Sequence, residues 1–344
     1  LEKIQLPHLP SLYGAMLAVV SYVLMGAGIP VSIPGVMDKL VRPEEATYPI
    51  HVTGASDSRQ TLVRFDPREH FEGALPPLQR PRFIPIIASN LLASVMLKKS
   101  DGRVDGFVVE GPTSGGHNAP PRGKLQLTPT GEPIYGERDR VDLEKIRELG
   151  LPFWVAGGCA SPGKLREVIR LGGTGIQVGT AFALSEESGL DEDLKKKLLA
   201  AVLDGSARVS TDMLASPTGF PFKVVQMEGT LSARDTYLNR TRVCDLGYLR
   251  EAYCGADGGI RTRCPGEPLQ TYVHKGGDVK DAEERKCLCN ALMANIGLGQ
   301  VRAAGVVELP LVTCGDALSE VGQFLLPGRN SYGAQEVIER LLGR

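Results

Sequence analysis

Residues 103–123, RVDGFVVEGPTSGGHNAPPRG, contain the pattern that decides the fold of this chain. The run 106–109, GFVV, is short and apolar, which is typical of a buried parallel strand. The strand then breaks at glycines and prolines, and Gly115 and Gly116 lead directly to His117. These glycines let the backbone approach a flat ligand, and histidine exchanges protons near neutral pH. We therefore predict a functional histidine at a strand end; the alternative is a glycine-rich turn with a solvated histidine.

Strands and helices alternate on both sides of this stretch. Predicted strands lie at 22–25, 83–89, 107–109, 153–156 and 175–179. Predicted helices lie at 11–18, 33–40, 91–99, 141–149, 162–171 and 194–203. This order predicts an α/β fold with a parallel sheet and outer helices. Because the residues suited to chemistry follow the strands, we expect a (β/α)8 TIM barrel, with a doubly wound sheet as the alternative.

Two stretches interrupt this alternation. Residues 42–82 read as an insertion, with a hairpin of 48–52 and 61–65 around a turn at 54–59. Residues 12–29 are uncharged and long enough to be tested as a membrane span. They lack flanking basic anchors and divide into a helix and a strand, so we expect a buried β/α unit instead.

Composition narrows the class of protein. The chain has 344 residues, of which 42% are hydrophobic and 23% charged, and its formal net charge is -1. This balance gives no reason to expect nucleic acid or a membrane as a partner. Seven cysteines, an odd number, and no visible signal peptide indicate free thiols and a cytoplasmic location.

Two glycine turns follow neighbouring predicted strands. Gly157 and Gly158 end the strand 153–156, and Gly179 and Thr180 end the next one. In a TIM barrel the last two β/α loops commonly bind a phosphate through backbone N–H groups, and Thr180 adds a hydroxyl donor. No Walker lysine motif and no GxGxxG motif occur, which argues against nucleoside triphosphatase and Rossmann sites.

Three motifs resemble those of a known family. AGG at 156–158, GIQVGTAF at 175–182 and GGH at 115–117 are similar to motifs of the nitronate monooxygenase family. These are FMN-dependent TIM-barrel enzymes related to flavin enoyl-acyl carrier protein reductases. The similarity covers about residues 20–190, and the segments 215–224, 244–250 and 286–290 suggest one bacterial branch.

The resemblance implies roles for individual residues. His117 matches the catalytic histidine of the family. The residues implied to bind FMN are Gly157, Gly158, Gly179 and Thr180 at the phosphate, Gly116 beside the ring, and Ser89 and Glu110 at strand ends. The family usually has Glu-Ala where this chain has Thr113 and Ser114, which leaves the substrate open.

The implied reaction is FMN-dependent oxidation of nitronates or nitroalkanes by O₂ to a carbonyl compound and nitrite, with His117 as base. Two alternatives are NAD(P)H-dependent reduction of an enoyl thioester and a truncated, non-catalytic relic. In either enzymatic reading the partner is a small molecule, and a homo-oligomer is compatible with the sequence.

Five strands are predicted where a barrel needs eight. The first three strands of the family have no counterpart, which corresponds to roughly 80–120 residues. Since the sequence begins with Leu1, we expect a fragment that lacks the first strands of the barrel.

The composition of the chain changes after residue 230, since six of the seven cysteines follow it. We expect a barrel portion at 1–230 and a mainly helical, cysteine-rich extension at 231–344, with helices at 289–296 and 333–342. Cys287 and Cys289 adjoin Arg285 and Lys286, which predicts lowered thiol pKa values. A zinc or iron–sulfur site using Cys264, Cys287, Cys289 and one more ligand is the alternative to the free thiols that we predict.

The other four histidines and one run of three lysines are expected to be solvated. These are His8, His51, His70 and His274, together with the run Lys195, Lys196 and Lys197.

Overall fold

The computed structural model describes residues 6–26, 28–55 and 61–344, and the chain divides into two compact units. The first unit holds residues up to 109 together with 142–153 and 248–263. The second holds 110–141, 154–247 and 264–344. The units are therefore interleaved along the chain, whereas the sequence pattern suggests one boundary near residue 230.

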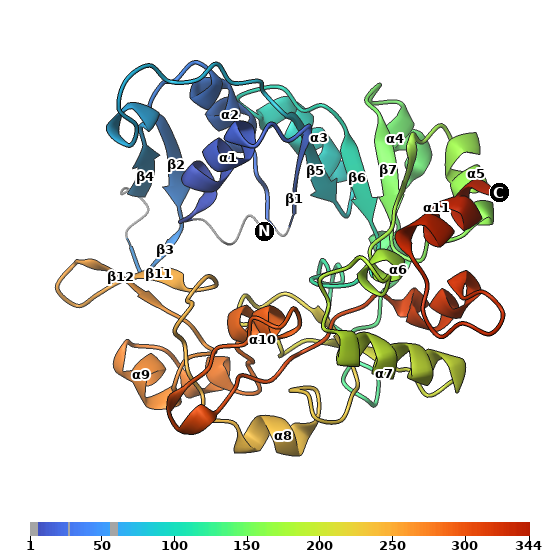
Figure 1. The fold of residues 1–344 in the computed structure, drawn as a ribbon. Helices are drawn as coiled ribbons and strands as arrows, with labels where there is room; N and C mark the ends of the chain where they lie inside the picture. Colours follow the sequence, from blue (N-terminus) through green and yellow to red (C-terminus); the bar gives the residue numbers. More distant parts are fainter. Residues whose placement is uncertain (1–5, 27, 56–60) are drawn as a thin grey trace. The chain divides into compact units, whose positions relative to one another are not determined.

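The predicted parallel strands are present (Figure 1). In the first unit, β1 (Tyr22–Met25) pairs with β5 (Arg82–Ile87), and β5 pairs with β6 (Phe107–Glu110), all in parallel. The N–H of Phe107 donates to the carbonyl of Pro152, just before β7 (Phe153–Ala156). In the second unit β7 pairs in parallel with β8 (Gly175–Gln177), giving the strand order β1-β5-β6-β7-β8.

Helices alternate with these strands, as the sequence pattern predicts. They are α1 (His8–Leu17), α2 (Ile33–Val41), α3 (Asn90–Lys99), α4 (Leu143–Arg147) and α5 (Pro162–Arg170). Ser161 caps α5 by accepting the N–H of Lys164 at 3.2 Å. The α/β class with parallel strands and outer helices is thereby confirmed, and five strands of the barrel order are described.

The insertion forms the predicted hairpin. β2 (Ala46–Ile50) pairs antiparallel with β4 (Thr61–Phe65). Residues 56–59 of the predicted turn lie outside the described residues. The short β3 (Val52–Thr53) pairs in parallel with β11 (Glu251–Cys254), which pairs antiparallel with β12 (Ile260–Arg263). A piece of the C-terminal region thus completes a small sheet in the first unit.

The uncharged stretch at 12–29 divides as predicted, since α1 ends at Leu17 and β1 begins at Tyr22. The expected burial is wrong for β1, whose Tyr22 and Leu24 are exposed because β1 is the last strand of the described order. None of the helices in the described part of the chain has both the length and the apolar character that crossing a membrane requires.

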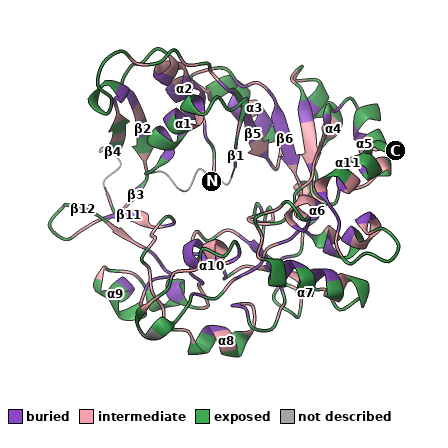
Figure 2. Cartoon of the chain, viewed as in Figure 1, coloured by how far each residue is buried: buried purple, intermediate pink, exposed green. Residues whose placement is uncertain are grey.

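The second unit has its own buried core. Its elements are α6 (Thr180–Ala183), α7 (Glu192–Leu203), β9 (Val209–Asp212), β10 (Phe222–Val225), α8 (Arg234–Asn239), α9 (Leu269–His274), α10 (Leu288–Ala294) and α11 (Ala334–Leu342). Buried residues of the second unit, such as Leu198, Phe324 and Tyr332, form one cluster. In Figure 2, α7 accordingly shows both buried and exposed colours. Across both units, short 3-10 helices lie at Pro67–Glu69, Glu137–Asp139, Val279–Ala282, Ala303–Gly305 and Asp316–Phe324.

The prediction for His8 is wrong. His8 is 6% exposed, and its ring meets the edge of Tyr48 at a centroid distance of 5.1 Å. It is buried because α1 packs against β2. His51, His70 and His274 are exposed, as predicted.

The prediction for the lysine run is wrong at Lys195 and right at its two neighbours. The ammonium of Lys195 is buried and donates to the carbonyl oxygens of Ser185, Glu186 and Ser188 at 3.1–3.3 Å. It also pairs with Glu192 at 2.6 Å. The turn at 185–188 presents three carbonyls to one point, and a buried ammonium satisfies them.

Lys195→Met should lower the free energy of unfolding by about 2–3 kcal/mol, because it leaves buried carbonyls without a donor. Lys196→Met, on the exposed side of the same helix, should change it by less than about 0.5 kcal/mol. Urea unfolding of both variants measures the difference, and equal effects would contradict the structural role of Lys195.

Candidate functional site

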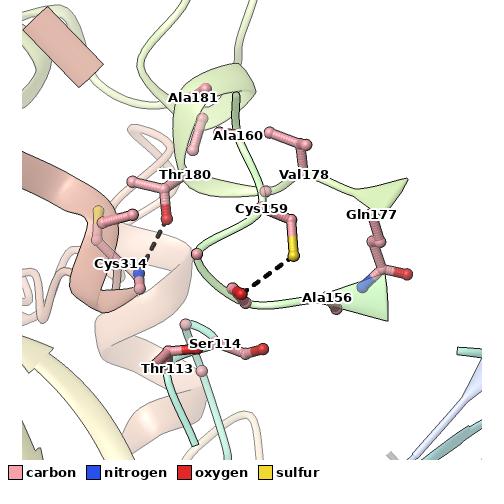
Figure 3. Close-up of a pocket in the computed structure, with 18 of the residues that line it drawn as sticks. Thr113, Ser114, Ala156, Cys159, Ala160, Gln177, Val178, Thr180, Ala181 and Cys314 are labelled. Atoms are coloured by element: carbon pink, nitrogen blue, oxygen red, sulfur yellow. Dashed lines mark hydrogen bonds between the residues drawn. The ribbon is translucent and has the colours of Figure 1, made fainter. Parts of the chain in front are cut away.

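A pocket with a volume of about 350 Å³ lies within the second unit. Four segments line it: 113–116 after β6, 156–160 after β7, 177–181 after β8, and 313–317 near the C-terminus. Figure 3 shows Thr113 and Ser114 facing the turn that carries Cys159, with Thr180 and Cys314 beside it. The strand ends predicted to form a site therefore do converge.

The turn after β7 requires glycine. Gly157 has φ of +91° and Gly158 has φ of +63°, both in the left-handed region. A Cβ on Gly157 would lie 2.6 Å from the hydroxyl oxygens of both Thr113 and Ser114. The loop after β6 thus packs directly on this turn. Gly179 differs, because a Cβ there would meet no atom within 4 Å and would point into open space.

A segment of the C-terminal region completes the pocket. The N–H of Gly315 donates to the hydroxyl of Thr180 at 2.9 Å, and the hydroxyl of Thr313 accepts the N–H of Gly116 at 2.8 Å. The N–H of Asp316 donates to the carbonyl of Thr113 at 3.0 Å. Sequence reasoning missed this segment, since no local motif links residues so far apart.

The structure brings most of the predicted binding residues together. Those that line the pocket are Glu110, Gly116, Gly157, Gly158, Gly179 and Thr180. His117 follows the lining loop but is not itself among the lining residues. Ser89 lies in the first unit, where its hydroxyl caps α3 by accepting the N–H of Leu92. That Ser89 contacts a ligand therefore stays a prediction.

His117 is half-buried between hydroxyl groups and aromatic rings. Its Nε2 lies 2.7 Å from the hydroxyl of Ser216, which lies 2.7 Å from the hydroxyl of Thr218. Ser216 is completely buried, and the edge of the His117 ring meets Phe222 at 4.8 Å. Burial lowers the pKa of His117 to about 4, so the imidazole is neutral at pH 7.

Glu110 is the last residue of β6 and lines the pocket. Burial raises its pKa to about 7, and the nearby hydroxyl of Ser114 offsets this rise in part. By distance and angle, however, the buried Ser114 hydroxyl has no hydrogen-bond partner in the described structure. The pocket thus contains a carboxyl group that titrates near neutrality.

The prediction of lowered thiol pKa values is wrong for Cys287. Hydrogen bonding with Cys289 and burial raise the pKa of Cys287, and contact with Cys244 and burial raise that of Cys264. The neighbouring Lys286 is engaged elsewhere, with Asp212 at 3.3 Å.

The metal alternative for these cysteines stays a prediction. Cys264, Cys287 and Cys289 are buried. Within the described ranges, no three histidine, cysteine, aspartate or glutamate side chains form a group that could hold a metal ion.

Gly157→Ala should destabilise the protein by about 1–3 kcal/mol, because it places a Cβ against two hydroxyls at a positive φ. Gly163→Ala, in the first turn of α5 with no close contact, should be neutral or slightly stabilising. Thermal unfolding compares the two. A Gly157→Ala protein as stable as the wild type would show that the turn and the 113–114 loop are not in contact.

The family model for nitronate monooxygenase matches residues 77–213, so the resemblance expected from the sequence is confirmed for this part of the chain. Over 124 residues the chain is 28% identical to (3aS,4S,5R,7aS)-5-hydroxy-7a-methyl-1-oxo-octahydro-1H-indene-4-carboxyl-CoA dehydrogenase of Mycobacterium tuberculosis. The match covers 36% of this chain and 30% of that relative, less than a third of its length.

Three solved structures are similar to this chain. FabK from Thermotoga maritima is 19% identical, with 96% of this chain and 70% of that chain covered and a TM-score of 0.47. Nitroalkane oxidase from Streptomyces ansochromogenes is 19% identical, with 76% and 57% covered and a TM-score of 0.40. The enoyl reductase domain of MlnA from Bacillus amyloliquefaciens is 12% identical, with 98% and 78% covered and a TM-score of 0.48. At these scores no residue role is transferred.

Proposed function

We propose that this chain binds FMN in the glycine-lined pocket and oxidises nitronates or nitroalkanes with O₂ to a carbonyl compound and nitrite. The observation that carries this proposal is that two glycine turns and Gly115 and Gly116, the residues just before His117, converge on one pocket. The elements of that convergence lie within residues 77–213, which the nitronate monooxygenase family model matches.

The pocket residues fit a phosphate-bearing flavin. The pocket volume of about 350 Å³ falls in the range of small-molecule sites. Gly179 leaves open space where any side chain would intrude, and the glycine turn at 157–158 bares its backbone N–H groups. Thr180 accepts a hydrogen bond from Gly315, so its own hydroxyl proton is available to a ligand.

Ser114, in the loop after β6, also fits a bound FMN. Its hydroxyl is buried, lines the pocket and has no hydrogen-bond partner among the residues that the structure describes. A buried hydroxyl of this kind is stabilised when a polar ligand group reaches it. When bound, FMN would supply the electron acceptor that the protein side chains lack.

His117 is the proposed base. Because its pKa is lowered to about 4, it is unprotonated at pH 7 and able to accept a proton. Such a weak base removes a carbon-bound proton only where the resulting anion is strongly stabilised, as the nitro group does in a nitronate. The hydroxyl of Ser216 fixes the orientation of the ring through Nε2, and Phe222 shields it from water.

A visible absorption spectrum of the purified protein tests cofactor binding, and His117→Ala tests the reaction. We expect His117→Ala to retain flavin and to lose turnover of neutral nitroalkane by about 10²-fold or more, while preformed nitronate is still consumed. His70→Ala, an exposed histidine of the first unit, is the control and should behave as the wild type. Unchanged nitroalkane turnover in His117→Ala would overturn the assignment of the base.

The second candidate is reduction of an enoyl thioester by NAD(P)H. The observation in its favour is the similarity to the carboxyl-CoA dehydrogenase of Mycobacterium tuberculosis, whose substrate is a coenzyme A thioester. Anaerobic mixing of the flavin-loaded protein with NADPH separates the two candidates. Rapid bleaching of the flavin would favour the reductase, and persistence of its colour would favour nitronate oxidation.

A further inference from the structure

Three residues that line the pocket carry ionisable side chains: Glu110, Cys159 and Cys314. The thiol of Cys159 donates to the carbonyl of Gly157 at 3.2 Å, and burial raises its pKa. Burial raises the pKa of Cys314 to about 12. Both thiols therefore stay neutral at physiological pH, which leaves Glu110 as the lining side chain whose charge can change there.

Glu110 is half-buried, and among the described residues its carboxyl lacks the cationic partner that a structural carboxylate commonly has. In the described part of the chain no lysine, arginine or histidine forms an ion pair with Glu110, although 22 such pairs occur elsewhere. Asp316, which lies between the lining residues Gly315 and Ala317, is itself paired with Lys223 at 2.5 Å. Buried charges without partners are costly, so their retention is typical of functional sites.

Ser114 provides the second half of the arrangement. Its hydroxyl is buried, faces the same pocket and lies close to Glu110. The pocket wall after β6 thus presents a carboxyl and a hydroxyl close to each other. Both groups can donate a hydrogen bond when the carboxyl is protonated.

We propose that Glu110 is a second catalytic acid–base residue of this pocket, which takes up a proton when an anionic nitronate binds and donates a hydrogen bond to a nitronate oxygen. Ser114 is its positioning residue. The choice of ligand rests on the proposed function, whereas the titration of the carboxyl does not.

The proton balance follows from the charge of the ligand. A nitronate carries one negative charge shared by its two oxygens, and an ionised Glu110 would repel it. Binding therefore draws a proton from solvent onto the carboxylate, whose O–H then donates to the ligand. When nitrite and the carbonyl product leave, the proton returns to solvent, so the residue is unchanged over one turnover. His117 acts on the carbon-bound proton, and Glu110 acts on the charge at oxygen.

The first test measures proton uptake without turnover. Anaerobic calorimetric titration of the FMN-loaded protein with ethylnitronate, in buffers of different ionisation enthalpy at pH 8, reports the protons exchanged on binding. We expect uptake of roughly one proton by the wild type and none by Glu110→Gln. Glu167→Gln, on the surface of α5, is the matched control and should take up as much as the wild type. Ser114→Ala removes a hydroxyl that favours the carboxylate, so it should move the uptake midpoint to higher pH.

The second test needs neither flavin nor substrate. A carboxyl whose pKa is raised in the folded protein stabilises the fold at low pH, and this contribution is lost as pH rises toward the folded pKa. The urea midpoint of the wild type should therefore fall between pH 5 and pH 8, relative to that of Glu110→Gln. Parallel midpoints for the two proteins would show that the carboxyl does not titrate in this range and would overturn the proposal.

The outcomes separate this proposal from the proposed function. Binding of FMN and ethylnitronate without proton uptake would overturn the role of Glu110 and leave the function standing. Binding of neither would overturn both. If Glu110→Gln does not fold, the Ser114→Ala shift decides, since a purely structural Ser114 would leave the midpoint of proton uptake unchanged.

Discussion

The site depends on one close contact, that of the Gly157 Cα with the hydroxyls of Thr113 and Ser114. There is no room for a Cβ at this point, and the backbone takes a φ of +91°. Because the contact joins the loop after β6 to the turn after β7, it sets the spacing between the two walls of the pocket. The same approach leaves the hydroxyl of Ser114 buried on the pocket side, close to the carboxyl of Glu110 but without a hydrogen-bond partner by distance and angle in the described structure.

Hydrogen bonds with the segment 313–316 also hold the loops of the pocket in place. They reach the loop after β6 at Thr113 and Gly116, and the turn after β8 at Thr180. Each of these bonds involves backbone or hydroxyl groups, so none leaves a distinctive residue pattern. The C-terminal region is therefore part of the pocket wall, although its cysteine-rich composition suggests a separate appendage.

The sequence predicts those features that are encoded locally. The bounds of β1 and β7 match the prediction, since short apolar runs between glycines and prolines leave few alternatives. The glycine turns can likewise be predicted from the sequence. The predictions for Lys195 and Cys287 are wrong for one shared reason. The ionisation and solvation of a side chain depend on partners such as Ser185 or Cys289, whose positions the tertiary fold determines. The same holds for Ser216, which no motif connects to His117.

Burial shifts the pKa values of His117 and Glu110 in opposite directions, and both shifts favour the neutral form of the side chain. It lowers the pKa of the histidine and raises that of the glutamate, so that each group favours its neutral form. A neutral imidazole accepts a proton and a neutral carboxyl donates a hydrogen bond, which separates the two roles without a change of residue type. Backbone N–H groups at the glycine turns likewise offer partial positive charge without a fixed cation. A pocket built in this way accommodates an anion because no ionised carboxylate opposes it, and its affinity for that anion must fall as Glu110 ionises.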